Sequence, residues 1–144
     1  MSHYASRIAL TLLASATLCA GVAGCATTPV PASDASPAST VYAPALTQPR
    51  AGTAVVTVTR DTGLSGSACN DVVYADGEKV AALGTGQTVT MYLSPGHHVL
   101  GTTAAGICAG GSASVEMTLA AGDRRDYRIG SRQSGDLLMQ PSAF

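Results

Sequence analysis

The chain has 144 residues and a formal net charge of −1, and only 12% of its residues are charged. This length leaves room for one compact domain with accessory segments. The near-neutral charge gives no argument for nucleic acid or another polyanion as a partner. Aromatic residues make up 4% of the chain, with no Trp and one Phe. The abundant small and β-branched residues favour strands and turns over helices.

The first residues have the three-part layout of a secretory signal. Residues 1–7 carry one Arg and no acidic residue, residues 8–22 are almost wholly apolar, and a small-residue cleavage site follows. The apolar run of about 15 residues is shorter than the roughly 20 that a permanent transmembrane helix needs. We therefore predict that residues 1–24 are a signal peptide removed on export, rather than a retained membrane span.

The motif Val22-Ala23-Gly24-Cys25 resembles the bacterial lipobox. In lipoproteins that carry this motif the thiol is diacylated, the signal is cut before the Cys, and the new amino terminus is usually acylated too. The resemblance implies that Cys25 is the lipid-anchored first residue of the mature protein, and two or more acyl chains anchor durably where one binds reversibly. Ala26 follows, rather than Asp, which in Gram-negative lipoproteins implies transfer to the outer membrane. Inner-membrane retention and a Gram-positive host stay open.

The four cysteines divide by position. Cys19 leaves with the signal and Cys25 lies at the cleavage point, so Cys69 and Cys108 remain in the folded part. In an exported chain such a pair predicts a disulfide. Closing a loop of about 40 residues would stabilise the fold by roughly 4 kcal/mol in the chain-entropy model. The alternatives, a metal pair or a Cys nucleophile, lack a CxxC spacing and an evident base.

Residues 25–52 have the composition of a linker. They include five Pro and many Ala, Ser and Thr, and their charged residues are Asp34 and Arg50. Such a segment predicts a disordered or polyproline-like tether that holds the domain clear of its membrane. The alternative, a Pro-rich ligand for a partner domain, lacks a basic-flanked PxxP pattern.

Residues 53–144 have the pattern of a small all-β domain. Short β-branched runs alternate with Gly, and Asp76-Gly77 and Pro95-Gly96 predict tight turns. This spacing predicts a small antiparallel β-sandwich of about 7–8 short strands, with a barrel as the alternative. The candidate strands are residues 53–60, 71–75, 79–83, 88–93, 97–103, 113–119, 127–129 and 137–140.

Residues 72–83 (VVYADGEKVAAL) and 92–100 (YLSPGHHVL) resemble the PEGA-type β-domain, which couples a V-x-V-D-G-x-x-V hairpin to an L-x-P-G-x-H-x-V turn. The resemblance covers about a third of the chain. It implies a small antiparallel β-sandwich on bacterial envelope proteins, binding surface polymers or proteins. The chain departs from the family by reading Ser-Pro-Gly-His at 94–97, where the name motif has Pro-Glu-Gly-Ala, and by adding Cys69 and Cys108.

Two groups of residues are candidates for catalysis or metal binding. His97 and His98 are neighbours on a predicted strand and would point to opposite faces, so we expect no shared metal ion. A hydrolase using Asp71, Asp76 or His98 would need these side chains to converge in one cleft. The serines lack a Gly-x-Ser-x-Gly elbow, so we expect neither enzymatic activity nor a cofactor.

The concentrated charge of the domain forms a candidate binding surface. A basic ridge could bind an anionic glycan, because Arg pairs with such anions bidentately. Asp123 and Asp126 partly neutralise it, and a solvated strand edge protected by charge is the alternative. The ridge comprises Arg124, Arg125, Tyr127, Arg128 and Arg132.

These features together predict a non-enzymatic envelope lipoprotein. Its partners would be a membrane, through the lipid on Cys25, and an envelope protein or surface glycan, with no nucleic acid, metal or cofactor. We expect it at the outer membrane. The alternative is a small inhibitor or accessory factor of a cell-wall hydrolase, presented through the loops around Cys69 and Cys108.

Overall fold

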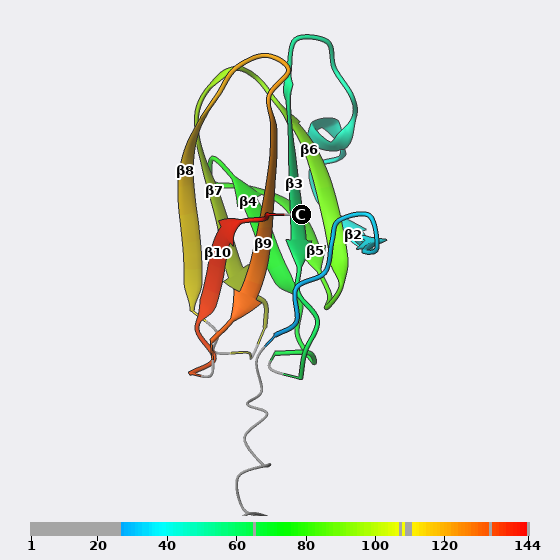
Figure 1. Ribbon diagram of the computed structural model, residues 1–144, viewed down its shortest axis with the longest axis vertical. Helices are drawn as coiled ribbons and strands as arrows, with labels where there is room; N and C mark the ends of the chain where they lie inside the picture. Colours follow the sequence, from blue (N-terminus) through cyan, green and yellow to red (C-terminus); the bar gives the residue numbers. More distant parts are fainter. Residues whose placement is uncertain (1–26, 65, 107, 109–110, 133, 144) are drawn as a thin grey trace, which may run out of the picture.

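Two five-stranded sheets form a sandwich in the computed structural model (Figure 1), which describes residues 27–64, 66–106, 108, 111–132 and 134–143. A 3-10 helix, η1 (Pro44–Thr47), lies beside them. The strands are β1 (Ser36–Pro37), β2 (Thr40–Val41), β3 (Ala54–Arg60), β4 (Asp71–Ala75), β5 (Glu78–Leu83), β6 (Gln87–Leu93), β7 (Gly96–Ala104), β8 (Ser112–Leu119), β9 (Arg124–Ser131) and β10 (Leu137–Pro141).

The strand order is β1-β6-β3-β9-β10 in one sheet and β2-β5-β4-β7-β8 in the other. Most neighbours are antiparallel, whereas β1–β6 and β3–β9 are parallel pairs. The predicted all-β sandwich is thus confirmed, and the eight predicted strands are present as β3 to β10. β9 extends beyond the predicted 127–129, because its first residues pair with β3 even though they are charged and exposed.

Every second side chain along the strands points between the two sheets, and these side chains form the core. On β6, Val89, Met91 and Leu93 are buried, while Thr88 and Thr90 point to the outer face. There Thr88 lies 3.0 Å from Thr59 of β3, oxygen to oxygen, as one rung of a cross-strand threonine ladder. The period-2 pattern read from the sequence therefore assigns the buried face of this strand correctly.

Residues 27–52 are not the disordered tether that their composition predicts. β1 pairs with β6, β2 pairs with β5, Ala43 is buried, and Leu46 packs against the core. The physical reason is that the edge strands of the sandwich expose unpaired backbone N–H and C=O groups. Another segment of the chain can pair with these groups through its own backbone, regardless of its side chains. Pro37 fits this role, since Pro is tolerated on an edge strand.

The described part of the chain is attached to the sandwich from its first residues. The backbone N–H of Thr28 donates to the Thr62 carbonyl at 2.7 Å, and the N–H of Thr62 donates back at 3.0 Å. Cys25 and the predicted signal peptide lie outside the described residues. Within those residues, no helix combines the length and the hydropathy that a membrane span requires.

The strand pairings sort the loops into two groups at opposite ends of the sandwich. We call the proximal end the one that carries Thr27 and Thr28 together with described residues of the loops after β3, β7 and β9. We call the distal end the one that carries the loop before β3 and the turns β4–β5, β6–β7 and β8–β9. Figure 1 shows the two ends at the bottom and top of the molecule.

Candidate functional site

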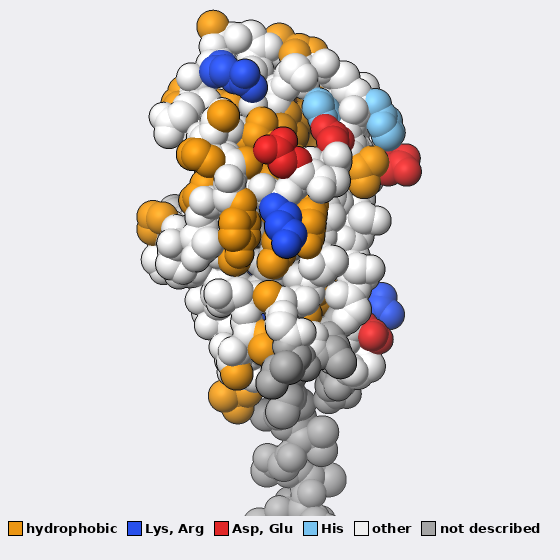
Figure 2. All heavy atoms as spheres, turned by 180° about the vertical axis from the view of Figure 1, so that it is seen from behind, with side chains coloured by type: hydrophobic (Ala, Val, Ile, Leu, Met, Phe, Trp, Pro, Cys, Tyr) orange, Lys and Arg blue, Asp and Glu red, His pale blue; other side chains and the backbone are white. Residues whose placement is uncertain are grey.

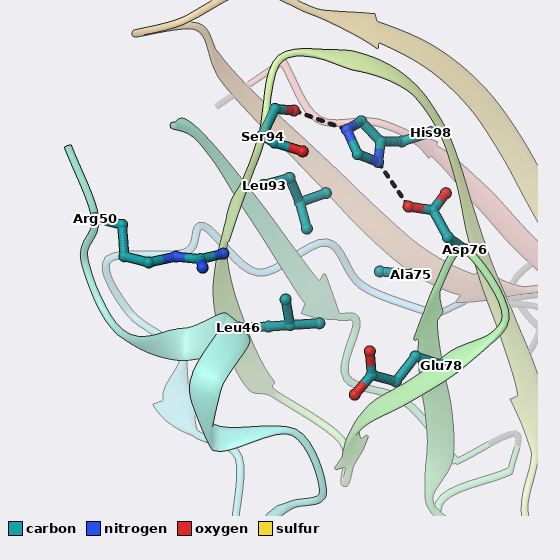
Figure 3. A pocket seen from close by; sticks show the side chains of 8 residues that line it. All are labelled: Leu46, Arg50, Ala75, Asp76, Glu78, Leu93, Ser94 and His98. Carbon is teal, nitrogen blue, oxygen red and sulfur yellow. Dashed lines mark hydrogen bonds and ion pairs between the residues drawn. The ribbon is translucent and has the colours of Figure 1, made fainter. Parts of the chain in front are cut away.

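A small cleft opens at the distal end, between η1, the β4–β5 hairpin and the end of β6 (Figure 3). It encloses about 170 Å³, less than the roughly 300–1,000 Å³ of a typical small-molecule site. This size suits a side chain or a terminal group of a larger partner better than a whole metabolite. The lining residues are Leu46, Arg50, Ala75, Asp76, Glu78, Leu93, Ser94 and His98.

The cleft combines an apolar floor with charged walls. Leu46 and Leu93 lie in its middle, and the side chains of Arg50 and Glu78 reach in from opposite sides (Figure 3). Figure 2 shows hydrophobic side chains gathered along the middle of this face, with acidic and His side chains beside them toward the distal end. The arrangement offers the Arg50 guanidinium and the Glu78 carboxylate to a partner, over a surface that favours apolar contact.

Asp76 and His98 join two turns at the upper wall of this cleft. Asp76 stands at φ 51° and Gly77 at φ 84°, as the central residues of the predicted hairpin turn require. Asp76 Oδ1 accepts a hydrogen bond from the Val99 N–H at 2.8 Å, and its Oδ2 lies 2.7 Å from His98 Nδ1. His98 Nε2 lies 2.8 Å from the Ser94 carbonyl oxygen.

These contacts decide what the imidazole can do. Burial lowers the pKa of His98, but its hydrogen bonds to Asp76 and to the Ser94 carbonyl outweigh burial, and the net pKa is raised. Burial raises the pKa of Asp76, yet the Val99 N–H and His98 bring it below its usual value. An imidazolium that donates from both nitrogens has no lone pair for a metal or a substrate proton. Both ring nitrogens of His98 thus face acceptors of the chain itself, and the side chain has a structural position.

The two adjacent histidines point to opposite faces, as predicted. His98 is buried, whereas the His97 side chain is 60% exposed and lies 3.5 Å from Glu116 on the neighbouring strand. In the part of the chain that the structure describes, no group of three or more His, Cys, Asp or Glu residues is arranged to hold a metal ion.

The three candidate hydrolase residues do not converge. Asp71 begins β4 at the proximal end, at the opposite end of the strand from the Asp76 turn. It is buried against Arg60, with Nε and Oδ2 2.8 Å apart, as an ion pair without the alignment of a hydrogen bond. Burial raises the pKa of Asp71 to about 6, and Arg60 offsets part of that rise. This pair is structural in position, because it is enclosed by the sandwich.

The predicted arginine ridge is divided by the structure. Arg124 and Arg125 are exposed at the distal start of β9, whereas Arg132 follows its proximal end. Tyr127 between them is buried in the core, and Arg128 pairs with the buried Asp61. The five residues therefore do not form one continuous surface, and a glycan-binding role for them stays a prediction.

Arg60 is a key residue that sequence reasoning missed. Its guanidinium donates to the carbonyls of Cys69, Leu83 and Gly66, so it holds the loop that carries the first disulfide cysteine. Cys69 is paired with Cys108, with Cα atoms 6.3 Å apart, as predicted. The charged Arg60-Asp61 dipeptide, at the end of an otherwise apolar and Thr-rich strand, was the available signal, since such residues are buried almost only when paired.

Asp61 forms a second buried junction at the proximal end. Its Oδ2 accepts hydrogen bonds from the Arg128 guanidinium and, at 3.4 Å, from the Thr27 hydroxyl. The Ser131 N–H also donates to Thr27 Oγ1, at 3.3 Å. Gly130 makes room for this junction, because a Cβ there would stand 2.9 Å from Asp61 Oδ2. Thr27 is thus held by β9 and by the end of β3 together.

The fold and these sites define a two-sheet β-sandwich closed along one side by its own N-terminal segment. The chain matches no family model, and a search of curated proteins finds no match. The similarity to PEGA-type domains rests on the motifs at residues 72–83 and 92–100 and stays a prediction.

Proposed function

We propose that this protein is a membrane-anchored lipoprotein of the bacterial envelope whose β-sandwich is a non-enzymatic binding module. The observation that carries the proposal is the Val22-Ala23-Gly24-Cys25 motif, which ends an apolar leader and directly precedes a disulfide-bonded domain. Disulfides persist in the oxidising compartments to which such a leader directs a chain. The PEGA-like turn motifs agree with an envelope role.

The distal cleft is the binding surface in this proposal. Its charged walls at Arg50 and Glu78 and its apolar floor are suited to a protein segment or a charged surface polymer. The nearby Asp76–His98 pair supports a binding role over a hydrolytic one, because both imidazole nitrogens are occupied by acceptors of the chain itself. The function is therefore recognition at a membrane rather than chemistry.

Substitution of Cys25 tests the anchor. In bacterial cells, the wild-type protein is expected to carry acyl chains by mass spectrometry and to partition into the detergent phase. Cys25→Ala is expected to lose both properties and to retain the leader. The matched control is Cys19→Ala, which alters a thiol within the apolar run and should behave as wild type. A mature wild-type protein without acyl chains would refute the anchor.

Substitution of the cleft tests the binding half. Captured envelope proteins or glycans should be retained by the wild type and lost with Glu78→Gln. Lys79→Gln is the control, because adjacent strand residues point to opposite faces. Equal recovery with the wild type and both variants, or no recovery with any of them, counts against the distal cleft as a binding surface.

A further inference from the structure

The N-terminal residues of the domain determine where it would sit relative to a lipid anchor. Thr27 and Thr28 are bound into the sandwich through Asp61, Thr62 and Ser131. Cys25 precedes Thr27 by two residues, which span at most about 7 Å even when fully extended. The headgroup layer on one side of a bilayer is itself about 5–8 Å thick. An acylated Cys25 would therefore hold the proximal end at the headgroups.

Among the described residues of the proximal loops, one large apolar side chain is exposed next to this attachment. Leu64 is 85% exposed, and it lies two residues after Thr62, which pairs with Thr28. A single exposed Leu on a protein surface is ordinary and by itself indicates nothing. Leu64, however, lies beside the segment that leads to Cys25. A lipid anchor on Cys25 would therefore bring this side chain to the bilayer interface.

The two ends of the sandwich differ little in net charge. Among the described residues of the proximal loops, the exposed charges are Arg132 and Asp136, which balance each other. At the distal end, the carboxylates of Asp76, Glu78 and Asp123 are accompanied by the cations of Arg50, Arg124 and Arg125. Charge therefore does not select which end faces an anionic membrane surface, and the orientation follows from the attachment of Thr27 and the position of Leu64.

We propose that the proximal end of the sandwich rests on the bilayer surface and that Leu64 enters its interface, so that the distal cleft faces away from the membrane. This inference rests on the proposed lipid anchor at Cys25. It replaces the free tether predicted from composition with a domain of fixed orientation, because residues 27–52 are bound to the sheets rather than extended between membrane and domain.

A tryptophan probe tests the orientation, because the chain contains no Trp. Leu64→Trp is compared with Ala121→Trp, an exposed residue of the distal β8–β9 turn, in the lipidated protein reconstituted in phosphatidylethanolamine/phosphatidylglycerol vesicles. The Leu64→Trp indole is expected to show blue-shifted emission and quenching by lipids brominated on their acyl chains. The Ala121→Trp indole should show neither.

The outcomes separate the orientation from the anchor. Acylated protein that floats with the vesicles but shows equal, solvent-like emission from both indoles would overturn the orientation and leave the anchor intact. Protein that carries no acyl chain and does not float would overturn the anchor, and the orientation with it. Far-UV circular dichroism checks that both variants keep the fold, as expected for substitutions at exposed loop positions.

Discussion

Single side chains with several partners hold the two ends of this sandwich. At the distal end, the Asp76 carboxylate binds both the Val99 N–H and the His98 ring, and so joins the β4–β5 turn to the start of β7. At the proximal end, Arg60 binds three carbonyls and contacts Asp71. The backbone N–H and C=O groups at strand ends and turns need hydrogen-bond partners, and these side chains supply partners that water would otherwise provide.

Substitution of Asp76 by Asn is expected to lower the free energy of unfolding by about 1 kcal/mol, because a charged hydrogen-bonded pair becomes a neutral one at a half-exposed site. The loss should be larger near pH 5.5 than near pH 8.5, as measured by urea denaturation at both values. The control is Glu116→Gln, whose partner His97 is exposed. An equal loss at the two pH values would contradict the assignment.

The sign of this pH dependence follows from the two pKa shifts. The pKa of His98 is raised in the folded protein, so its contribution is complete below the unfolded value of about 6.5 and is lost as the pH rises through the folded value. The pKa of Asp76 is lowered, so its contribution is present above the unfolded value of about 3.9 and is lost as the pH falls through the folded value. The Asp76–His98 pair therefore stabilises the folded protein most at pH values above the titration of Asp76 and below the titration of His98.

At the scale of elements, the N-terminal segment closes one side of the sandwich. β1 extends the β6 edge of one sheet and β2 extends the β5 edge of the other. The Tyr42 N–H donates to the Val80 carbonyl at 2.7 Å, and the buried Ala43 follows it. Both edges that would otherwise offer unpaired backbone to another chain are thereby shortened.

Placing a charge at Ala43 is expected to release this segment. In Ala43→Glu, a buried carboxylate would lack a counter-charge, so the amides of Ala38 and Tyr42 should exchange hydrogen rapidly while those of β3 stay protected. Ala45→Glu changes an exposed neighbour in η1 and should leave exchange slow. Rapid hydrogen exchange at Ala38 and Tyr42 in the wild-type protein itself would contradict the pairing of this segment and support the disordered tether predicted from composition.

At the scale of the whole molecule, the disulfide crosslinks two proximal loops. Cys69 follows β3 and Cys108 follows β7, with a sequence separation of 39 residues. The Ala105 N–H also donates to the Asn70 carbonyl at 2.8 Å beside the bond. In the proposed orientation these are the loops that would lie nearest the membrane, and the disulfide ties the two loops together.

Removing the disulfide is expected to lower the free energy of unfolding by about 2–4 kcal/mol, the range for a crosslink that closes a loop of this length. The comparison is between the wild type and Cys69→Ser/Cys108→Ser in urea denaturation, each with and without reductant. Reductant should lower the midpoint of the wild type to that of the double variant and leave the variant unchanged. Equal midpoints for the oxidised wild type and the variant would show that the bond contributes little.

Local patterns in the sequence determined the strands β3 to β10 and the Asp76-Gly77 turn, because side-chain alternation and positive-φ turns depend on neighbouring residues alone. The pairing of Cys69 with Cys108 followed from their being the two cysteines left in the predicted domain. The opposite orientations of His97 and His98 followed from the same strand geometry.

The tertiary structure alone decided the rest. The N-terminal segment pairs through its backbone, which composition does not reveal, so residues 27–52 were predicted to be disordered. Arg60 meets Asp71, Arg128 meets Asp61, and His98 meets Asp76 across separations that only the sheet order brings together. The same sheet order divides the arginine ridge by burying Tyr127, because strand alternation assigns faces while sheet packing decides which face is covered.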